Sequence, residues 1–442
     1  MRDETTCEIK IGHAIERLRE IQSETVDTVI TSPPYWGLRD YKTEPVVFGR
    51  DKDCCPQEDD CIWMDPTTYQ RRSNDDGKSE KQASNQGANN RDDPITFTTC
   101  SKCGAWKGQL GLEQSPEQFV EHLVEIFEEC RRILKPTGTL WVNLGDSYMS
   151  KGSTTNPEQY GLQKHRDEAG KFRPKSIPDG YKEKDLVGLP WLFAFAARKA
   201  GWYLRNDIVW AKSISGPHYR GGVSMPEPVQ DRCTRSHEFF FHFSKSKRYY
   251  YDTLSYAEPC ANDDEVDGGA LGGVRNMRTV WHFNPQPFPG AHFAVYPKHL
   301  IEPIIRASSS HTCCGDCSVP WVRRQPENQF SPDCECHGKI EKLAVPTVAA
   351  MGEEENDRTK NIKVYVSDLD LLDHPTQPSV IVDPFSGSGT TGIVALENGR
   401  SYIGIELNEE YAELSLRRFK QERTGLTVGK FRESAVDLKE YW

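Results

Sequence analysis

Two short stretches of this sequence contain the side chains best suited to chemistry. The first is "SPPY", Ser32 to Tyr35, which follows the apolar run Val26–Ile30. A strand cannot continue through Pro33 and Pro34, because neither proline donates a backbone hydrogen bond and both fix φ near about −65°. The corner therefore ends a buried strand, and it holds rigid carbonyls beside a serine hydroxyl and an aromatic ring.

The second stretch is "DPFSGSGTT", Asp383 to Thr391, which follows another apolar strand. Gly387 and Gly389 allow a tight turn into a predicted helix, so that a ligand can touch the main chain at the helix N-terminus. Glu406 ends the next predicted strand. A carboxylate at that place can accept hydrogen bonds from both hydroxyls of a ribose.

Three ligands are compatible with such a glycine loop. NAD remains a candidate ligand when the loop is considered by itself, because Gly387, Gly389 and Gly392 have G-x-G-x-x-G spacing. ATP would need a Walker lysine, and none follows Gly389. S-adenosylmethionine needs a turn against its amino-acid part and an acid on its ribose, which this loop and Glu406 supply. A purely structural turn is the remaining interpretation.

Composition and charge limit the class of protein. The chain has 442 residues and a net charge of −11, which argues against a generally basic nucleic-acid-binding surface. Local basic patches remain at Arg131–Arg132, Lys164–Lys175 and Lys245–Arg248. The polar start and the shortness of the longest apolar run, Leu189–Ala197, predict a cytoplasmic protein without a membrane span.

Fourteen cysteines in a cytoplasmic chain indicate metal ligands or free thiols rather than disulfides. Cys314-x2-Cys317 and Cys334-x-Cys336 form two close pairs joined by a loop, which is the spacing of a structural tetrahedral zinc site. Zinc is favoured over free thiols at these four residues.

A second cysteine group is more loosely spaced. Cys100-x2-Cys103 resembles a zinc knuckle, but its partners, Cys55 and Cys61 with Cys54 as an alternative, lie across a long polar tract. Both groups are expected to be structural, with no open coordination position for catalysis.

Strands and helices alternate along the parts of the chain that contain the two motifs. Residues 7–36 are predicted as strand, helix and strand, and residues 379–419 as strand, glycine loop, helix, strand and helix. Ser115 to Gln118 is a helix-start signal, with serine at the cap and proline at the first helical position. The aromatic stretch 237–252 is predicted as a hairpin turning near residues 244–247. This alternation predicts an α/β fold with a mostly parallel, doubly wound sheet.

The two motifs together resemble the amino-group DNA methyltransferases. The matching residues are "TSPPYW" (31–36), "DPFSGSGTT" (383–391) and "GIELN" (404–408). The tetrapeptide precedes the cofactor loop, which is similar to the circularly permuted order called the β class. The resemblance covers most blocks outside the cysteine-rich and polar insertions. It implies a Rossmann-like fold dependent on S-adenosylmethionine.

On this resemblance the chain divides into five parts. They are a catalytic half (1–41 and 113–310), a polar cysteine-containing insertion (42–112), a mobile loop (150–184), a cysteine-rich zinc-binding insertion (311–375) and a cofactor-binding half (376–442).

The chemistry of this family accounts for the rigid corner. The exocyclic amine of a base is a poor nucleophile, because its lone pair is delocalised into the ring. Ser32 Oγ and the Pro33 carbonyl, followed by Pro34, can accept its two hydrogens and turn the lone pair towards the methyl donor. Tyr35 is predicted to stack on the extruded base, with Trp36 as a second wall. Transfer is then a direct in-line displacement without a covalent intermediate.

The resemblance also implies contacts to the cofactor and the base. Asp146, in "NLGDSY", is a candidate for lining the substrate pocket, and a strand-end turn is the other interpretation. The segment "HFAVYP" (292–297) is similar to the part that covers the methionine end of the cofactor. The predicted cofactor-binding residues are Asp383, Phe385, Ser386, Gly387, Gly389, Thr390, Thr391, Glu406, Phe293 and Pro297.

The Ser-Pro-Pro-Tyr form is similar to enzymes that methylate cytosine N4 in double-stranded DNA, and adenine N6 is the alternative target. A catalytically inactive, zinc-stabilised DNA-binding protein is an alternative of another class. A protein glutamine methyltransferase is disfavoured, because that family places its cofactor loop before an Asn-Pro-Pro-Tyr. The resemblance leaves a cognate restriction endonuclease, the DNA site and the oligomeric state open, and it suggests a prokaryotic or phage origin.

Overall fold

The computed structural model describes residues 5–37, 43–69, 95–150, 177–212, 229–259, 274–285, 296–324, 329–332, 334, 336, 339–346, 359–366 and 375–422. The chain divides into two compact units. Unit 1 comprises residues 1–32, 129–143 and 201–442, and unit 2 comprises residues 33–128 and 144–200.

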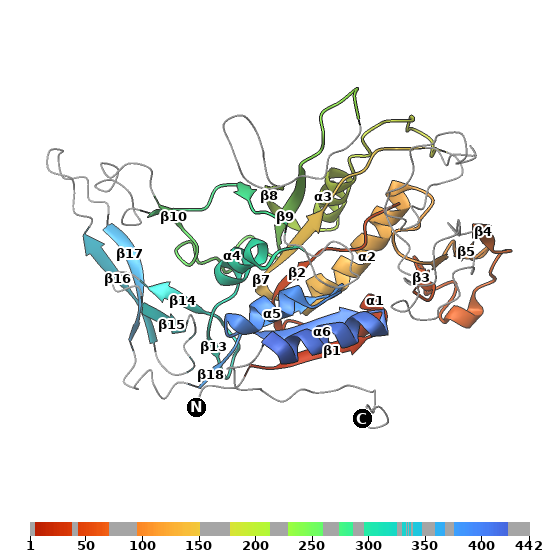
Figure 1. The fold of residues 1–442 in the computed structure, drawn as a ribbon. Coiled ribbons are helices and arrows are strands. Elements are labelled where there is room, and N and C mark those ends of the chain that lie inside the picture. The colour runs from red at the N-terminus through yellow and green to blue at the C-terminus, as the bar shows by residue number, and fades with distance from the viewer. Residues whose placement is uncertain are drawn as a thin grey trace. The chain divides into compact units, whose positions relative to one another are not determined.

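Unit 1 is built on an eight-stranded sheet in the order β1-β20-β19-β2-β7-β9-β8-β12. Figure 1 labels β1, β2, β7, β8 and β9 of this sheet. Neighbouring strands are parallel from β1 through β7, and β12 is parallel to β8, whereas β8 and β9 are antiparallel. The predicted doubly wound, mostly parallel sheet is therefore confirmed. The strands are β1 (Cys7–Ile11), β20 (Ser401–Glu406), β19 (Val380–Asp383), β2 (Val26–Thr31), β7 (Leu134–Leu144), β9 (His237–Ser244), β8 (Tyr203–Ala211) and β12 (Val280–His282).

The two C-terminal strands of this sheet lie between the first two N-terminal strands. β20 pairs with β1, and β19 pairs with β2 through Ile381 opposite Thr28. Because parallel strands end at the same edge of a sheet, the carboxyl ends of β20, β19 and β2 lie side by side. Ser32, which follows β2, and the glycine loop after β19 therefore lie at one edge of the sheet, although they are far apart in the chain.

Helices pack on this sheet and share its apolar core with the strands. They are α1 (Ala14–Arg19), α4 (Lys298–Ser308), α5 (Thr390–Glu397) and α6 (Glu409–Glu422). α4 contacts α5 and β2, and α6 contacts β1 and β20. Ile301, Ile381, Tyr402 and Phe419 belong to one buried cluster, which holds these helices against the strands.

The predicted aromatic hairpin is wrong. Only its first arm is a strand, β9, and residues 245–252 form no strand. β9 already has β7 on one side and β8 on the other, so no edge remains for a second arm. The backbone of the second arm bonds elsewhere: Tyr250 N donates to Thr137 O at 2.9 Å, and Asp252 N donates to Ala307 O at 2.8 Å.

Unit 2 contains an antiparallel sheet in the order β3-β6-β5-β4. Its strands are β3 (Val46–Phe48), β6 (Trp106–Gly108), β5 (Ile95–Thr99) and β4 (Thr67–Tyr69), with a short 3-10 helix, η1, at Glu58–Asp60. α2 (Pro116–Ile133) begins in this unit, where Ser115 Oγ accepts from Gln118 N at 3.2 Å, as the helix-start signal predicts. α3 spans Leu189–Lys199.

Four two-stranded sheets complete the described structure. They are β10 (Glu258–Pro259) with β11 (Val274–Arg275), β13 (Cys313–Cys314) with β18 (Thr376–Gln377), β14 (Trp321–Arg324) with β15 (Gln329–Pro332), and β16 (Lys339–Pro346) with β17 (Thr359–Val366). Within the residues described, every helix is too short or too polar to cross a lipid bilayer.

A buried ion pair joins the amino end of the large sheet to the second cysteine group. Lys135 Nζ lies 2.8 and 2.9 Å from the two carboxylate oxygens of Asp27 and donates to Ser318 O at 2.9 Å. Asp27 Oδ2 also accepts from Val380 N at 2.9 Å. Both charged side chains are under one-tenth exposed, so each depends on the other for its compensating charge.

Lys135→Met should lower the free energy of unfolding by roughly 3–5 kcal/mol, because it leaves the Asp27 carboxylate buried without its cation. Asp27→Asn combined with Lys135→Met should recover part of that loss. Urea denaturation of the parent protein, Lys135→Met and the double variant measures the free energy of unfolding of each. Equal stability of Lys135→Met and the parent would contradict the pairing.

Candidate active site and metal centres

The end of β2 is tied to the end of β19 by a direct side-chain hydrogen bond. Thr31 Oγ1 donates to Asp383 Oδ1 at 2.6 Å across 352 positions of sequence. Thr31 is the last residue of β2, and Ser32 follows it. The first residue of the predicted catalytic corner is thereby fixed beside the start of the glycine loop.

Asp383 is an organising carboxylate at the base of this edge. Besides Thr31, it accepts from Thr391 Oγ1 at 2.6 Å, from Tyr296 OH at 3.3 Å and from Phe385 N at 3.0 Å. The side chain is almost fully buried. Burial raises the pKa of Asp383, and its hydroxyl and amide donors oppose that rise.

The glycine loop forms the predicted tight turn. Gly387 has φ 52° and Gly389 has φ 77°, which are left-handed conformations that favour glycine. A Cβ at Gly389 would lie 2.9 Å from the ring of Phe419, so the position also excludes a side chain sterically. α5 begins immediately afterwards at Thr390.

Glu406 contacts this turn directly. Its Oε2 accepts from Gly387 N at 2.7 Å, and its Oε1 accepts from Asn408 N at 2.9 Å. A carboxylate has about four lone-pair sites, so each oxygen keeps capacity for one further donor, such as a ribose hydroxyl. Burial raises the pKa of Glu406 to about 7, against the two backbone N–H groups, which lower it.

Several predicted loop residues serve the loop itself. Ser386 Oγ lies 2.9 Å from Tyr402 OH, and Ser386 N donates to Ile405 O. Thr390 Oγ1 accepts from Arg418 at 3.1 Å, and Thr391 binds Asp383. These hydroxyls shape the turn, and their direct contact with a cofactor stays a prediction.

The predicted catalytic tetrapeptide differs in exposure along its length. Ser32, Pro34 and Tyr35 are partly exposed, and Pro33 is buried. Trp36 is only 4% exposed, and its indole N–H donates to Glu113 O at 3.0 Å. Trp36 could therefore offer a ring face to a base only by moving, whereas Tyr35 is accessible.

Asp146 has a structural partner in unit 2. Its Oδ1 accepts from Ser147 N at 2.9 Å and from Leu189 N at 3.1 Å, at the first residue of α3. These contacts match the strand-end turn that the sequence left open, and its contact with a substrate stays a prediction.

In the segment "HFAVYP", Pro297 is the residue before α4, and Phe293 lies outside the described residues.

Three contributors to the loop were not predicted. Tyr296 OH contacts both Thr391 Oγ1 and Asp383. From α6, Ser415 Oγ donates to Gly387 O at 2.7 Å, and Arg418 donates to Ser388 O at 2.6 Å. Tyr296 lies inside a stretch that the resemblance singled out, but the spacing of α6 gave no sign that its polar residues reach back to the turn.

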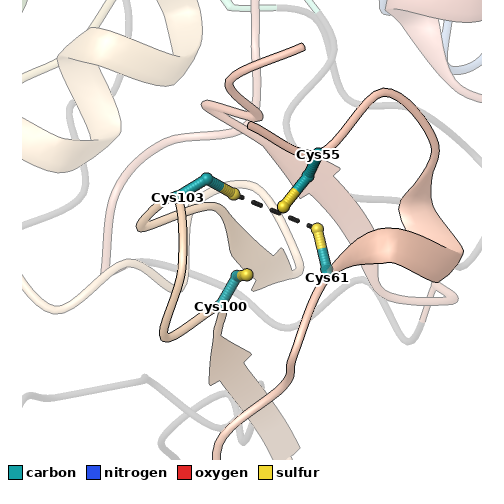
Figure 2. Close-up of side chains that lie close together, drawn as sticks. All are labelled: Cys55, Cys61, Cys100 and Cys103. Atoms are coloured by element: carbon teal, nitrogen blue, oxygen red, sulfur yellow. Dashed lines mark hydrogen bonds between the residues drawn. The ribbon is translucent and has the colours of Figure 1, made fainter. Parts of the chain in front are cut away.

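Both predicted cysteine sets come together in space. In unit 2, the sulfurs of Cys55, Cys61, Cys100 and Cys103 lie within 4.8 Å of one another. Figure 2 shows these four side chains pointing towards a common centre. In unit 1, the sulfurs of Cys314, Cys317, Cys334 and Cys336 do the same.

Each of the two cysteine sets contains a backbone turn, and the two turns are of the same type. Cys100 N donates to Ala105 O at 2.7 Å and Gly104 N donates to Cys100 O at 2.9 Å. In the second set, Cys314 N donates to Val319 O at 2.9 Å and Ser318 N donates to Cys314 O at 3.0 Å. The fifth residue of each turn, Gly104 or Ser318, has a left-handed φ of 75° or 61°.

The donor sets fit structural zinc. Four converging thiols are the ligands that Zn²⁺ takes in closed tetrahedral sites, and such sites leave no position open for catalysis. Ser318 lies in the turn of the second set, and its backbone carbonyl also accepts a hydrogen bond from Lys135 Nζ.

Comparison with known proteins assigns the family. Residues 26–316 and 371–417 match the model of the N6/N4 methyltransferases, described as DNA methylase. The chain is 32% identical over 418 residues to the type II methyltransferase M.SmaI of Serratia marcescens, covering 95% of this chain and 92% of that protein. It is 33% identical over 415 residues to M.Cfr9I of Citrobacter freundii, covering 94% and 88%.

Solved structures give weaker likenesses over nearly the whole chain. A candidate DNA modification methylase from Thermus thermophilus, in complex with S-adenosyl-L-methionine, is 17% identical with a TM-score of 0.44, covering 98% of this chain and 100% of that one. The cytosine-N4-specific PvuII DNA methyltransferase is 14% identical with a TM-score of 0.44, covering 95% and 88%.

The chain belongs to the N6/N4 DNA methylase family, and it is an amino-group DNA methyltransferase. The resemblance on which the sequence analysis rested is thereby confirmed.

Affinity for S-adenosylmethionine should depend on pH through Glu406. With a pKa of about 7, its carboxylate is mostly ionised at pH 8 and mostly protonated at pH 6. Because the ionised form accepts both ribose hydroxyls better, the dissociation constant should be about tenfold larger at pH 6 than at pH 8. Isothermal titration calorimetry measures this ratio. Glu406→Gln should bind more weakly with a flat profile, and an unchanged pH dependence in that variant would contradict the assignment.

Each cysteine set should hold one zinc ion, giving about two per chain by inductively coupled plasma mass spectrometry. Cys103→Ser should lose about one of them, because a closed site then lacks a ligand. Cys54→Ser is the matched control, since Cys54 is exposed beside Cys55 but outside the set. Full zinc content in Cys103→Ser would exclude the first site.

Proposed function

We propose that this protein transfers a methyl group from S-adenosylmethionine to N4 of a cytosine within a specific double-stranded DNA site. The observation that supports this best is the position of Ser32, one residue beyond the hydrogen bond from Thr31 to Asp383. The serine of the Ser-Pro-Pro-Tyr corner is thereby held at the sheet edge that bears Gly387 and Glu406.

The cofactor site follows from the loop geometry. At Gly387 a Cβ would approach only Phe385 O, at 3.9 Å, so the turn leaves room there for the amino-acid part of the cofactor, whereas Gly389 packs against Phe419. Glu406 accepts from the ribose hydroxyls with the lone pairs that its backbone contacts leave free. When bound, S-adenosylmethionine supplies a methyl group on a positively charged sulfur.

The corner residues prepare the amine. Ser32 Oγ and the Pro33 carbonyl accept the two amine hydrogens, so that the nitrogen lone pair leaves conjugation with the ring. The fixed φ of the prolines holds these acceptors in place before the base arrives. Tyr35 stacks on the base once it has left the helix, and the rate gain comes from positioning.

The choice of cytosine over adenine rests on the residue at position 32. A serine begins this tetrapeptide, and the form with serine is associated with cytosine N4. Adenine N6 is the second candidate, because the family contains both specificities.

The relatives suggest the biological setting. M.SmaI and M.Cfr9I are both named type II methyltransferases, and each aligns over nearly the whole of this chain. By analogy, this protein would protect a site in bacterial or phage DNA, in the cytoplasm, from a cognate restriction endonuclease.

An inactive DNA-binding protein is the rival of another class. It would not need Ser32, an open glycine turn and an acid at Glu406 on one edge. Binding of S-adenosylmethionine without any methyl transfer to DNA would support it.

Mass spectrometry of nucleosides from DNA treated with the protein and S-adenosylmethionine should show N4-methylcytosine. Ser32→Ala should reduce the transfer rate by about 10²-fold, as loss of one preorganised polar contact does elsewhere, with cofactor affinity unchanged. Ser23→Ala, an exposed serine earlier in the same segment, is the control. N6-methyladenine in place of the cytosine product would refute the choice of base.

A further inference from the structure

The aromatic end of the catalytic corner is held by residues 109–113, at the C-terminal end of the polar cysteine-containing insertion (42–112). Trp36 Nε1 donates to Glu113 O at 3.0 Å, and Gly37 N donates to Gly111 O at 2.9 Å. At Gly111, φ is 94°, and a Cβ would lie 3.2 Å from the carbonyl oxygen of Tyr35. The two backbones therefore touch, and residues 109–113 set the course of residues 35–37.

The shape of this supporting segment depends on one buried carboxylate. Glu113 is fully buried. Its Oε2 accepts from Gly111 N at 2.8 Å, and its Oε1 lies 2.9 Å from His122 Nδ1. The side chain thus closes a turn on its own backbone and joins that turn to α2. Burial raises the pKa of Glu113, and the contact with His122 opposes the rise.

His122 in turn is held between two rings of the polar cysteine-containing insertion (42–112). Its ring stacks on Phe48 of β3, with centroids 4.5 Å apart and an interplanar angle of 16°. It stacks on Trp106 of β6 at 5.0 Å and 28°. Trp106 comes directly after the turn of Cys100 and Cys103, whose sulfurs belong to the first metal set.

A continuous chain of contacts therefore runs from the first cysteine set to the catalytic corner. It passes through Trp106, His122, Glu113 and Trp36, all within unit 2. The contact of Glu113 with His122 and Gly111 N is the polar link of this chain of contacts. It is specific, because a buried carboxylate that is satisfied by an imidazole and a backbone amide tolerates fewer arrangements than apolar packing does.

We propose that Glu113 is a positioning residue for base capture, and that metal binding at Cys55, Cys61, Cys100 and Cys103 sets the place of Tyr35 through it. The insertion then acts as a brace for the residue that stacks on the extruded base. This inference rests on the proposed function, since it assigns Tyr35 that role.

The test separates positioning from general stability. Glu113→Ala removes both side-chain contacts, whereas Glu113→Gln keeps an acceptor for Gly111 N and a donor for His122. Asp252→Ala is the control. Asp252 is a buried carboxylate of unit 1 that binds Arg323 at 2.8 and 3.0 Å. The readouts are kcat, the dissociation constant of S-adenosylmethionine and the fluorescence of 2-aminopurine at the target position of a duplex that the parent methylates.

Glu113→Ala should lower kcat by at least about 20-fold and suppress the fluorescence rise that accompanies base extrusion, because the stacking residue is no longer held in place. Cofactor affinity should stay within about twofold, since the residues that hold the cofactor belong to unit 1. Glu113→Gln should restore both signals. Cys103→Ser should reproduce the loss, and Asp252→Ala should not. Trp36→Phe, which removes the indole N–H together with part of the buried ring system but leaves Glu113 in place, should weaken the fluorescence rise even if Glu113→Ala does not fold.

Normal kcat and normal fluorescence in Glu113→Ala, or in Trp36→Phe where Glu113→Ala does not fold, would overturn the inference. A fluorescence loss in Asp252→Ala equal to that in Glu113→Ala would also overturn it. A parent protein that transfers no methyl group would instead refute the proposed function. The two failures are therefore distinguishable.

Discussion

The hydrogen bond from Thr31 to the Asp383 carboxylate is the interaction on which the rest of the site depends. It is 2.6 Å long, fully buried, and joins the last residue of β2 to the last residue of β19. The same carboxylate accepts from Thr391, Tyr296 and the Phe385 amide. A carboxylate can be buried at this place because four donors compensate for its lost hydration. As a result, one side chain fixes the end of β2, which leads into Ser32, the glycine loop and the start of α5 relative to one another.

The order of the strands makes this junction non-local. β19 and β20 come from the C-terminal part of the chain and lie between β1 and β2. The sheet therefore cannot form its central pairs until both ends of the chain are present. Contacts of such long sequence separation are expected to slow folding, because loop-closure entropy is lost before the contacts form.

Much of the fold and the site could be predicted from local patterns. Prolines after an apolar run mark the end of β2, and glycines before a helix mark the cofactor turn, because each residue type restricts its own backbone. In each set the sequence correctly predicts the pair with a two-residue gap, Cys100 with Cys103 and Cys314 with Cys317, because such a gap closes a turn by itself.

Other features could not be predicted because they depend on which partners the fold supplies. The stretch 245–252 has the pattern of a strand, yet β9 offers it no free edge. Tyr296, Ser415 and Arg418 hold the glycine loop from separate segments of the chain. Trp36 is aromatic like Tyr35, but its neighbour Glu113 draws it into the interior. Sequence position alone does not distinguish the two rings.

The most direct test of the central claim compares two threonines of β2. Thr31 and Thr28 are both fully buried, but Thr28 donates to Ser308 O, away from the loop. Each change to valine removes one buried hydrogen bond, so both should destabilise the protein by a similar amount, about 1–3 kcal/mol. If the bond from Thr31 to Asp383 positions Ser32, Thr31→Val should lower kcat by about tenfold or more, while Thr28→Val should leave it near the parent value. Equal kcat in the two variants would show that this bond does not position Ser32.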